Sequence, residues 1–560
     1  FAGWAAYYSL RGVVENTAYR VLAGVTYALL PAVTGAVASG HIGTAIVAGL
    51  LPFVVRSLAR LLSPSGTLRR AAATALLLAV VTACVPALGF LLLIGAVVAT
   101  LWSWTRERRA ALPLIGRLWF AIGAPLLLLM PWTPWLFLHP SALLFEIGLN
   151  SPTIADPGLN AFDVALLHPG GPGMAPLWAT AGLVAAALLA FLRRDRLIYV
   201  TAAWTVGLAA LALGVLQTAW AITPPGATAP VHPWPGPATL VLGAAMIGAA
   251  VMAADGLQRR MSRTNFNIMQ PLAFVVGIAG ALSPLLVAIF WFPQATDVLV
   301  NAPRRVVPAF VAADATGPAA PRTLMLHQDR DGAVRYALVN GVGPTLGDAE
   351  TAPPSAIWGE LNQAVSYLAS GRGGAEVDQL AGYGIRYILL AHDSDPTLIG
   401  TLDGESGLRR LSTAGGEVLW RISGVTSRVR TIAGEDVQVV PVADGTHLTA
   451  DPYVATELES ARAMRTLSLG VEPNDGWSVA VVDPASGARQ EAQSVPGTGV
   501  NAWSQSFVAP AAAVEIEATF NSATRSALLW LQALGLGFVL LLSLPSRRRT
   551  EDIDPDEVAA

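Results

Sequence analysis

Ten long apolar runs constrain the fold of this 560-residue sequence more than any other feature. A membrane-spanning helix needs about 20 mostly apolar residues, and these runs reach or approach that length. Charged residues make up 13% of the sequence, against about 25% in a typical soluble protein. We therefore predict a polytopic α-helical membrane protein of about ten spans. The predicted spans are Val21–Val37, Ile42–Leu58, Ala71–Pro86, Ala87–Trp104, Leu118–Leu138, Ala175–Leu192, Leu197–Thr218, Pro237–Ala254, Pro271–Trp291 and Ala527–Leu544.

The positions of arginine give these spans an orientation. Cytoplasmic loops of membrane proteins carry an excess of basic residues, and all 35 basic residues here are arginine. If successive spans alternate in direction, the arginine-rich connections fall on one side, whereas loops such as 39–41 and 223–236 contain no arginine. This pattern predicts a multi-pass plasma-membrane protein with residues 292–525 outside the cell and the acidic tail in the cytoplasm. The arginines on the predicted cytoplasmic side are Arg11, Arg20, Arg56, Arg60, Arg69, Arg70, Arg106, Arg108, Arg109, Arg117, Arg193, Arg194, Arg196, Arg259, Arg260, Arg263 and Arg547–Arg549.

The predicted external block has two parts with different sequence patterns. Residues 292–425 mix strand patterns such as Ile385–Ala391 with helical spacing of apolar residues in Ile357–Ala369. Residues 426–525 show short alternating segments separated by turns, which is typical of a β-sandwich. We therefore predict an extracellular α/β module followed by an extracellular β-sandwich module. The other expected elements are strands Arg322–His327, Val334–Val339, Leu419–Ile422, Val437–Val442, Ala463–Val471, Ser478–Val482, Trp503–Val508 and Val514–Phe520, and the helix Glu376–Tyr383.

The beginning of the sequence bears on the domain plan. The apolar stretch Phe1–Leu10 is too short to span a bilayer and lacks the features of a signal peptide. We expect it to be the end of a membrane helix, so that the chain is the C-terminal part of a longer protein. The predicted order is a transmembrane helical bundle truncated at its N-terminus (residues 1–291), the α/β module (292–425), the β-sandwich module (426–525), a final transmembrane helix (526–546) and the cytoplasmic tail (547–560).

The predicted external loop His139–Met174 holds the candidate catalytic residues. It is far longer than the usual connection between helices, and it carries Glu146, Asp156, Asp163 and His168. Acid–base chemistry on a lipid-linked substrate requires a carboxylate or a histidine near the membrane surface. We therefore predict these four residues as candidate catalytic groups. The alternative interpretation, which the residues by themselves favour, is a solvated loop that covers helix ends.

Two D-x-D patterns in the external block form a second candidate. They are Asp329-Arg330-Asp331 and Asp393-Ser394-Asp395, the latter directly after a predicted strand. Paired carboxylates at the end of a strand can hold a divalent metal and a diphosphate. The same composition is common in turns, and a turn is the interpretation we favour.

Several classes of function are disfavoured. The net charge of −3 argues against a nucleic-acid binder. No Asp, Glu or His lies at the centre of a predicted span, which argues against a proton-coupled pump or an ion channel. A phosphate-binding loop of the G-x-x-x-x-G-K type requires lysine, and no cofactor is evident in the sequence. Tryptophans cluster at the predicted outer ends of spans, which indicates an interfacial belt or, alternatively, sugar stacking: Trp132, Trp135, Trp178, Trp220, Trp234 and Trp291.

The order of several stretches carries a resemblance to a known family. Thr26–Arg60 combines an apolar helix, a turn of small residues and a second helix that opens with Ile-Gly-Thr and contains Pro52. The sequence is similar to multi-pass membrane glycosyltransferases of the GT-C type. More closely, it resembles the C-terminal membrane region of large actinobacterial family 2 glycosyltransferases. The other matching stretches are His168–Trp178, Trp234–Thr239, Pro308–Asp314, Gly343–Glu350, Leu380–Leu389, Asp475–Trp477 and Trp503–Phe507.

The resemblance implies the membrane portion of a glycosyltransferase that acts in cell-envelope polysaccharide assembly. The implied partners are the lipid bilayer and a polyprenyl-phosphate-linked sugar or glycan, with no nucleic acid. In such proteins a nucleotide-sugar transferase domain precedes the membrane part, so the catalytic domain and any divalent metal are expected upstream of Phe1. The catalytic carboxylate of GT-C enzymes lies in the first external loop, which would also precede Phe1, so no catalytic residue is carried over. The alternative is a non-catalytic membrane scaffold that binds glycan or serves as a translocation partner.

Overall fold

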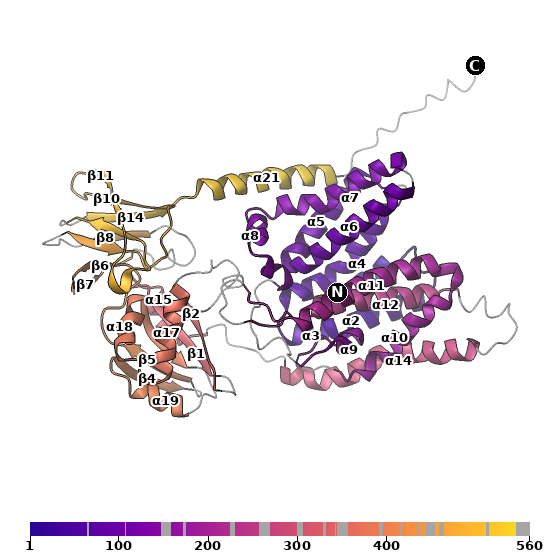
Figure 1. Cartoon of the computed structure of the whole chain (residues 1–560), viewed down its shortest axis with the longest axis horizontal. Helices are drawn as coiled ribbons and strands as arrows, with labels where there is room; N and C mark the ends of the chain where they lie inside the picture. Colours follow the sequence, from indigo (N-terminus) through magenta and orange to yellow (C-terminus); the bar gives the residue numbers. More distant parts are fainter. Residues whose placement is uncertain are drawn as a thin grey trace, which may run out of the picture. The chain divides into compact units, whose positions relative to one another are not determined.

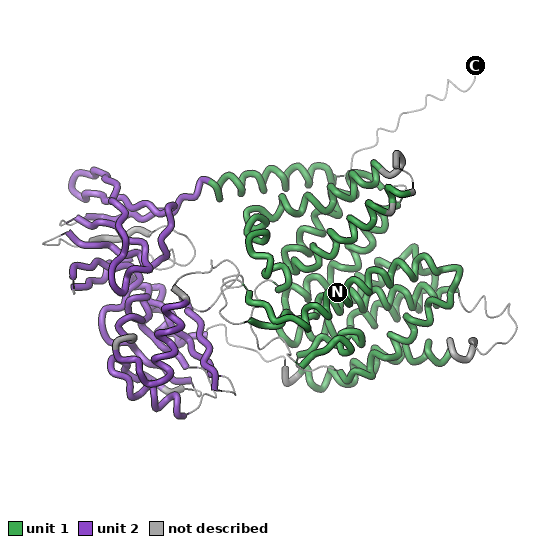
Figure 2. Tube along the Cα trace, in the orientation of Figure 1, with its two compact units in different colours: residues 1–300, 349–351, 524–560 green, residues 301–348, 352–523 purple. Residues whose placement is uncertain are grey.

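A computed structural model divides the chain into two compact units (Figure 2). The first unit comprises residues 1–300, 349–351 and 524–560, and the second comprises residues 301–348 and 352–523. The residues that the structure describes are 1–63, 66–106, 108–146, 158–171, 175–224, 230–256, 269–298, 306–328, 332–341, 343, 357–390, 396–414, 417–434, 436–442, 454–458, 464–510 and 514–544.

The first unit is a bundle of apolar helices (Figure 1). Within the described ranges, seven helical segments are long and apolar enough to cross a membrane, with α2 and α3 (Thr17–Ala38) counted as one, or eight if α7 and α8, bent by 97°, form one span. The chain is therefore a multi-pass membrane protein, although these helices are fewer than the ten predicted spans. The helices are α1 Ala2–Ser9, α2 Thr17–Ala28, α3 Pro31–Ala38, α4 Ile42–Leu62, α5 Leu68–Cys84, α6 Pro86–Arg106, α7 Arg108–Leu128, α8 Trp132–Leu138, α9 Ala161–Ala165, α10 Trp178–Leu189, α11 Leu197–Ala219, α12 Gly236–Ala254, α14 Met269–Val298 and α21 Ala523–Ser543.

Two of the predicted spans form shorter helices. α5 has 17 residues because Pro86 opens α6 immediately after it. Proline fits the first turn of a helix, where its missing N–H has no intrahelical partner, but it cannot continue the preceding helix. α10 is followed by a 3₁₀ turn, Ala190–Leu192, and the two together cover Trp178–Leu192.

Small residues bring the helices of the first unit into close contact. A Cβ added to Gly3 of α1 would lie 2.7 Å from the carbonyl oxygen of Gly24 in α2, and one added to Gly243 of α12 would lie 2.8 Å from Leu30. Glycine at such positions lets helices approach closely, as is common in membrane bundles. The core of the unit forms around these contacts and includes Tyr27, Val47, Leu78, Leu213, Leu240 and Leu242.

The second unit begins with an α/β module. Its five-stranded sheet has the order β2-β1-β3-β5-β4, in which β1 and β3 are parallel and the other pairs are antiparallel. The buried cluster on one face joins strand residues such as Leu324 and Ile388 to Leu361 of α17 and Leu380 of α18, and a second cluster joins Leu389 to Val311 of α15. The sheet is therefore covered on both faces. Its elements are α15 Ala309–Ala315, β1 Arg322–Gln328, β2 Val334–Val339, α17 Ile357–Ala369, α18 Gly374–Gly382, β3 Ile385–Leu390, α19 Pro396–Asp403, β4 Leu408–Ala414 and β5 Glu417–Ile422.

Two further sheets complete the second unit. Their strand orders are β11-β10-β14-β8 and β12-β13-β9-β6-β7. Leu467 and Phe507 of one sheet share a buried cluster with Val479 and Ile516 of the other, so the two sheets pack face to face. The strands are β6 Arg430–Ala433, β7 Asp436–Val439, β8 Val454–Leu458, β9 Arg465–Ser468, β10 Trp477–Val482, β11 Arg489–Glu491, β12 Ser494–Val495, β13 Ser506–Ala509 and β14 Val514–Phe520.

Candidate functional site

A buried carboxylate, Glu146, lies at the N-terminal end of α4. The backbone N–H and the hydroxyl of Thr44 both donate hydrogen bonds to it, the hydroxyl at 2.8 Å from Oε2. The first N–H groups of a helix have no intrahelical partner, and the helix dipole favours a negative charge beside them. The start of α4 therefore provides a binding position for this carboxylate.

His41, the residue that precedes α4, completes the environment of Glu146. Its Nδ1 lies 2.9 Å from Oε2 of Glu146, and its side chain is 2% exposed. The imidazole stacks on the indole of Trp234, with 3.7 Å between the ring centroids and 8° between the ring planes. The other ring nitrogen, Nε2, is buried and has no hydrogen-bond partner among the residues that the structure describes.

Trp234 connects this pair to the stretch that follows α9. Its Nε1 donates to the carbonyl oxygen of Gly170 at 3.4 Å. The adjacent Gly171 has φ +108°, a conformation open to glycine, and a Cβ there would lie 3.0 Å from Oγ of Ser39. His41, Gly43, Thr44, Glu146, Gly170 and Trp234 are buried and thus form one polar site, which we call the His41–Glu146 site.

Gly43 makes room for the carboxylate. A Cβ at this position would lie 2.8 Å from Oε1 of Glu146 and 2.8 Å from the carbonyl oxygen of Cys84. Cys84, the one cysteine of the sequence, therefore ends α5 beside the site. Cys84 is partly buried, and its thiol offers a chemical probe of this region.

The structure places the four predicted catalytic residues differently. Glu146 lies in the buried site. Asp163 accepts a hydrogen bond from the backbone N–H of Asn160 and completes a capping box at the start of α9. His168 donates its backbone N–H to the carbonyl oxygen of Asp163, two residues before Gly170. Asp156 lies outside the described residues, as do Asp329-Arg330-Asp331 and Asp393-Ser394-Asp395.

Sequence reasoning missed His41 and Thr44. In the sequence, loop 39–41 stands out only for its lack of arginine. A histidine at the edge of an apolar run was the available signal, because ionisable groups near membrane spans often mark functional sites. No group of three or more potential metal ligands occurs within the described ranges.

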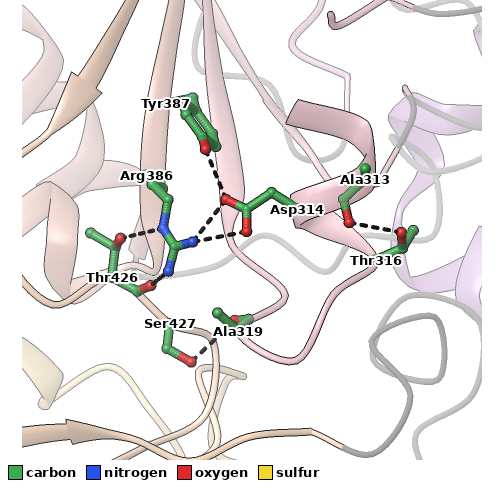
Figure 3. Close-up of polar contacts among 8 residues, drawn as sticks. All are labelled: Ala313, Asp314, Thr316, Ala319, Arg386, Tyr387, Thr426 and Ser427. Atoms are coloured by element: carbon green, nitrogen blue, oxygen red, sulfur yellow. Dashed lines mark hydrogen bonds and ion pairs between the residues drawn. The ribbon is translucent and has the colours of Figure 1, made fainter. Parts of the chain in front are cut away.

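A second polar cluster lies in the α/β module (Figure 3). Nη1 of Arg386 in β3 contacts both carboxylate oxygens of Asp314 in α15, at 2.9 and 2.8 Å, and the hydroxyl of Tyr387 donates to Oδ2 at 2.8 Å. Arg386 also donates from Nε to Oγ1 of Thr426 at 2.8 Å. Burial, followed by the Asp314 carboxylate, raises the pKa of the Tyr387 hydroxyl. The polar groups of the cluster bond to one another. We therefore interpret the cluster as a structural connection between α15 and the sheet.

Buried arginines form a third polar cluster, at the end of α18. Nη1 of Arg322 donates to the carbonyl oxygen of Tyr383 at 2.9 Å, and Nη1 of Arg430 donates to that of Ala381 at 2.8 Å. Burial lowers the pKa of both guanidinium groups to about 10. Positive charge is favourable at a helix C-terminus, which is where these guanidinium groups lie. Nη2 of Arg322 also donates to the carbonyl oxygen of Gly470. The arginines therefore connect α18 to the β-rich part of the unit.

Comparisons with known proteins give few matches. No protein-family model and no curated protein matches the chain. Solved structures that are similar include the cryo-EM structure of arabinofuranosyltransferase AftD from mycobacteria, at 13% identity and a TM-score of 0.46 over 93% of this chain and 50% of that one. A mutant of that protein in a second class gives 15% identity and a TM-score of 0.42, with 93% and 53% of the two chains covered. The chain therefore spans about half the length of the structures it matches.

Proposed function

We propose that this chain is the membrane portion of a glycosyltransferase that acts in cell-envelope polysaccharide assembly on a polyprenyl-phosphate-linked sugar or glycan. One observation carries the proposal. Three stretches that bear the sequence resemblance, separated along the chain, contribute to the His41–Glu146 site. Thr26–Arg60 supplies His41 and Thr44, His168–Trp178 supplies Gly170, and Trp234–Thr239 supplies Trp234.

The polar character of the site supports a functional role. Burying a carboxylate and an imidazole in an apolar helical bundle is costly unless they are paired, and such groups in membrane proteins usually serve function. A purely structural core at this position needs neither ionisable side chain. The site therefore suits chemistry on a polar group that is carried to the membrane by an apolar chain.

The position of the site along α4 supports action at the outer membrane face. His41 precedes the first residue of α4, whereas Arg56 and Arg60 lie near its other end. Because basic residues favour the cytoplasmic side, we propose that the His41–Glu146 site faces outward. A lipid-linked sugar presents its sugar at the membrane surface and its chain to the bilayer, which fits a site at the end of a span.

Transfer activity in membranes that contain the full-length protein tests this function. The assay follows a labelled sugar from a polyprenyl-phosphate donor to endogenous polysaccharide. We expect Glu146→Gln to lower transfer by about 100-fold or more, and Asp195→Asn, which changes a carboxylate paired with Arg193 away from the site, to leave it unchanged. Equal transfer by the wild type and Glu146→Gln would contradict a catalytic site here and favour the scaffold alternative.

A further inference from the structure

We infer that Nε2 of His41 is the proton acceptor in the transfer step and that Glu146 acts on the reaction by positioning the imidazole. The inference rests on the proposed function, because it assigns roles within the same site. It departs from two expectations from sequence: that Glu146 itself is a candidate acid–base group, and that the catalytic carboxylate implied by the resemblance lies upstream of Phe1.

The hydrogen bonds around Glu146 define the state of the imidazole. The backbone N–H of Thr44 can only donate, so Oε1 of Glu146 is an acceptor. Nδ1 of His41 lies 2.9 Å from Oε2, and we assign Nδ1 as the donor, because a carboxylate accepts hydrogen bonds at both of its oxygens. A neutral imidazole that donates from one nitrogen has its lone pair on the other. Nε2 is therefore the basic atom of the pair.

Glu146 is less suited than His41 to take a substrate proton. Both of its oxygens already accept hydrogen bonds from Thr44 or His41. About three of the four lone-pair positions of the carboxylate are therefore taken by donors fixed by the fold. Nε2 has no such competitor among the described residues, although its ring is 2% exposed. A buried acceptor left without a partner costs free energy, and we assign the substrate hydroxyl as the partner of Nε2.

The surroundings of the ring match the requirements of proton transfer. A base oriented by a third group is the arrangement by which histidine activates hydroxyl nucleophiles. When Nε2 takes a proton, the ring becomes positive, and the Glu146 carboxylate on Nδ1 compensates that charge. The stacked face of Trp234 adds a cation–π attraction at a centroid distance of 3.7 Å. Each contact is already in place before the proton arrives.

The step balances with two co-reactants, a lipid-phosphate-linked sugar donor and a glycan hydroxyl acceptor. The acceptor hydroxyl gives its proton to Nε2 as its oxygen forms a bond to the anomeric carbon of the donor sugar. The bond between that carbon and the phosphate oxygen breaks, and its electron pair leaves with the lipid phosphate. The imidazolium then releases its proton to solvent and regenerates the neutral ring.

Chemical rescue distinguishes this role from a structural one. His41→Ala leaves an imidazole-sized space between Trp234 and Glu146, whereas His41→Gln fills that space with an amide. We expect both variants of the full-length protein to lose kcat by about 100-fold or more, with KM for the donor changed by less than about threefold. Added imidazole should restore part of kcat in His41→Ala and none in His41→Gln. A histidine with a purely structural role would not lower kcat while leaving KM nearly unchanged, and added imidazole would not restore kcat in His41→Ala alone.

Variants of Glu146 test the positioning role. Glu146→Asp, which keeps a carboxylate, should retain more kcat than Glu146→Gln, and imidazole should rescue His41→Ala poorly when Glu146 is also changed to Gln. The rate of Cys84 alkylation reports on the fold around the site in each variant. If His41→Ala does not fold, His41→Gln still tests the inference, because a kcat within about threefold of the wild type would overturn it.

The outcomes separate this inference from the proposed function. A His41→Gln protein with kcat within about threefold of the wild type, beside an inactive Glu146→Gln protein, would overturn the role of His41 and leave the proposed function standing. Loss of kcat without rescue by imidazole in a folded His41→Ala protein would also overturn it. A wild-type protein that transfers no sugar would overturn the proposed function and the inference together.

Discussion

The imidazole of His41 lies flat against the indole of Trp234, with 8° between the two ring planes. The indole is in turn fixed by its hydrogen bond to Gly170 and by contact with Gly236, the first residue of α12. The orientation of His41 toward Glu146 therefore depends on the position of a side chain from a distant part of the chain.

Gly236→Ala tests this dependence. A methyl group at residue 236 would overlap the Trp234 ring, so the indole must shift away from His41. Overpacking of this kind costs about 1–3 kcal/mol. We expect a lower unfolding temperature and reduced transfer activity, both measured on the purified full-length protein in nanodiscs.

Gly248→Ala is the matched control on the same helix. The nearest atom to its added Cβ is Cε of Met252 at 3.9 Å, which is ordinary van der Waals contact. Alanine in a helix interior is favoured over glycine by about 0.5–1 kcal/mol. Equal unfolding temperatures for the Gly236→Ala and Gly248→Ala proteins would contradict the proposed packing.

Thr44 stabilises the buried carboxylate through its hydroxyl as well as its backbone. Thr44→Val keeps the shape of the side chain but removes the donor that lies 2.8 Å from Oε2 of Glu146. A hydrogen bond to a charged group contributes about 1.5–3 kcal/mol, and we expect Thr44→Val to lose a similar free energy of unfolding. Denaturant unfolding of the full-length protein measures the change. Thr44→Ser, which keeps the hydroxyl, should lie near the wild type, and a Ser variant as unstable as Val would argue against this bond.

The ion pair of Arg386 and Asp314 offers a prediction on the second unit. Their side chains are 15% and 28% exposed, and Arg386→Met would leave the partly buried carboxylate without its guanidinium. We expect a loss of about 1–3 kcal/mol of local stability, seen as faster amide hydrogen exchange in α15. Arg410→Met breaks a more exposed pair with Asp403, with side chains 40% and 35% exposed, for which surface ion pairs predict about 0–1 kcal/mol. Similar exchange in α15 for both variants would show that the ion pair of Arg386 and Asp314 contributes little to the local stability of α15.

Much of the local structure could be predicted from the sequence because it depends on short-range patterns. Apolar spacing predicted the bounds of α17 as Ile357–Ala369, and the strand-like composition of Val334–Val339 predicted β2, both as observed. The short strands β6 and β11 were missed because four and three residues carry too little pattern. α5 and α10 were expected as spans because hydropathy alone does not locate helix ends.

The candidate site was predictable only in part because its contacts are non-local. A carboxylate in a long loop singled out Glu146, but its partner His41 lies 105 positions earlier. The buried arginines at α18 illustrate the same limit. Arginine is usually exposed, and nothing near Arg430 in sequence reveals the carbonyl oxygen of Ala381 that accepts its hydrogen bond.

Tyr383 predicts how the second unit responds to alkaline pH. Burial, and then its hydrogen bond to Glu360, raises the pKa of this hydroxyl. The unfolded chain releases the tyrosine proton near pH 10, whereas the folded chain keeps it to higher pH. The stabilising contribution of Tyr383 is therefore complete below about pH 10 and is lost as the pH rises above that value. Tyr383→Phe removes the titration, so it should weaken the alkaline loss of stability. Amide hydrogen exchange in α18, compared between the wild type and Tyr383→Phe at the same pH on either side of pH 10, measures this effect. An equal alkaline increase in exchange for the two proteins would show that another group controls it.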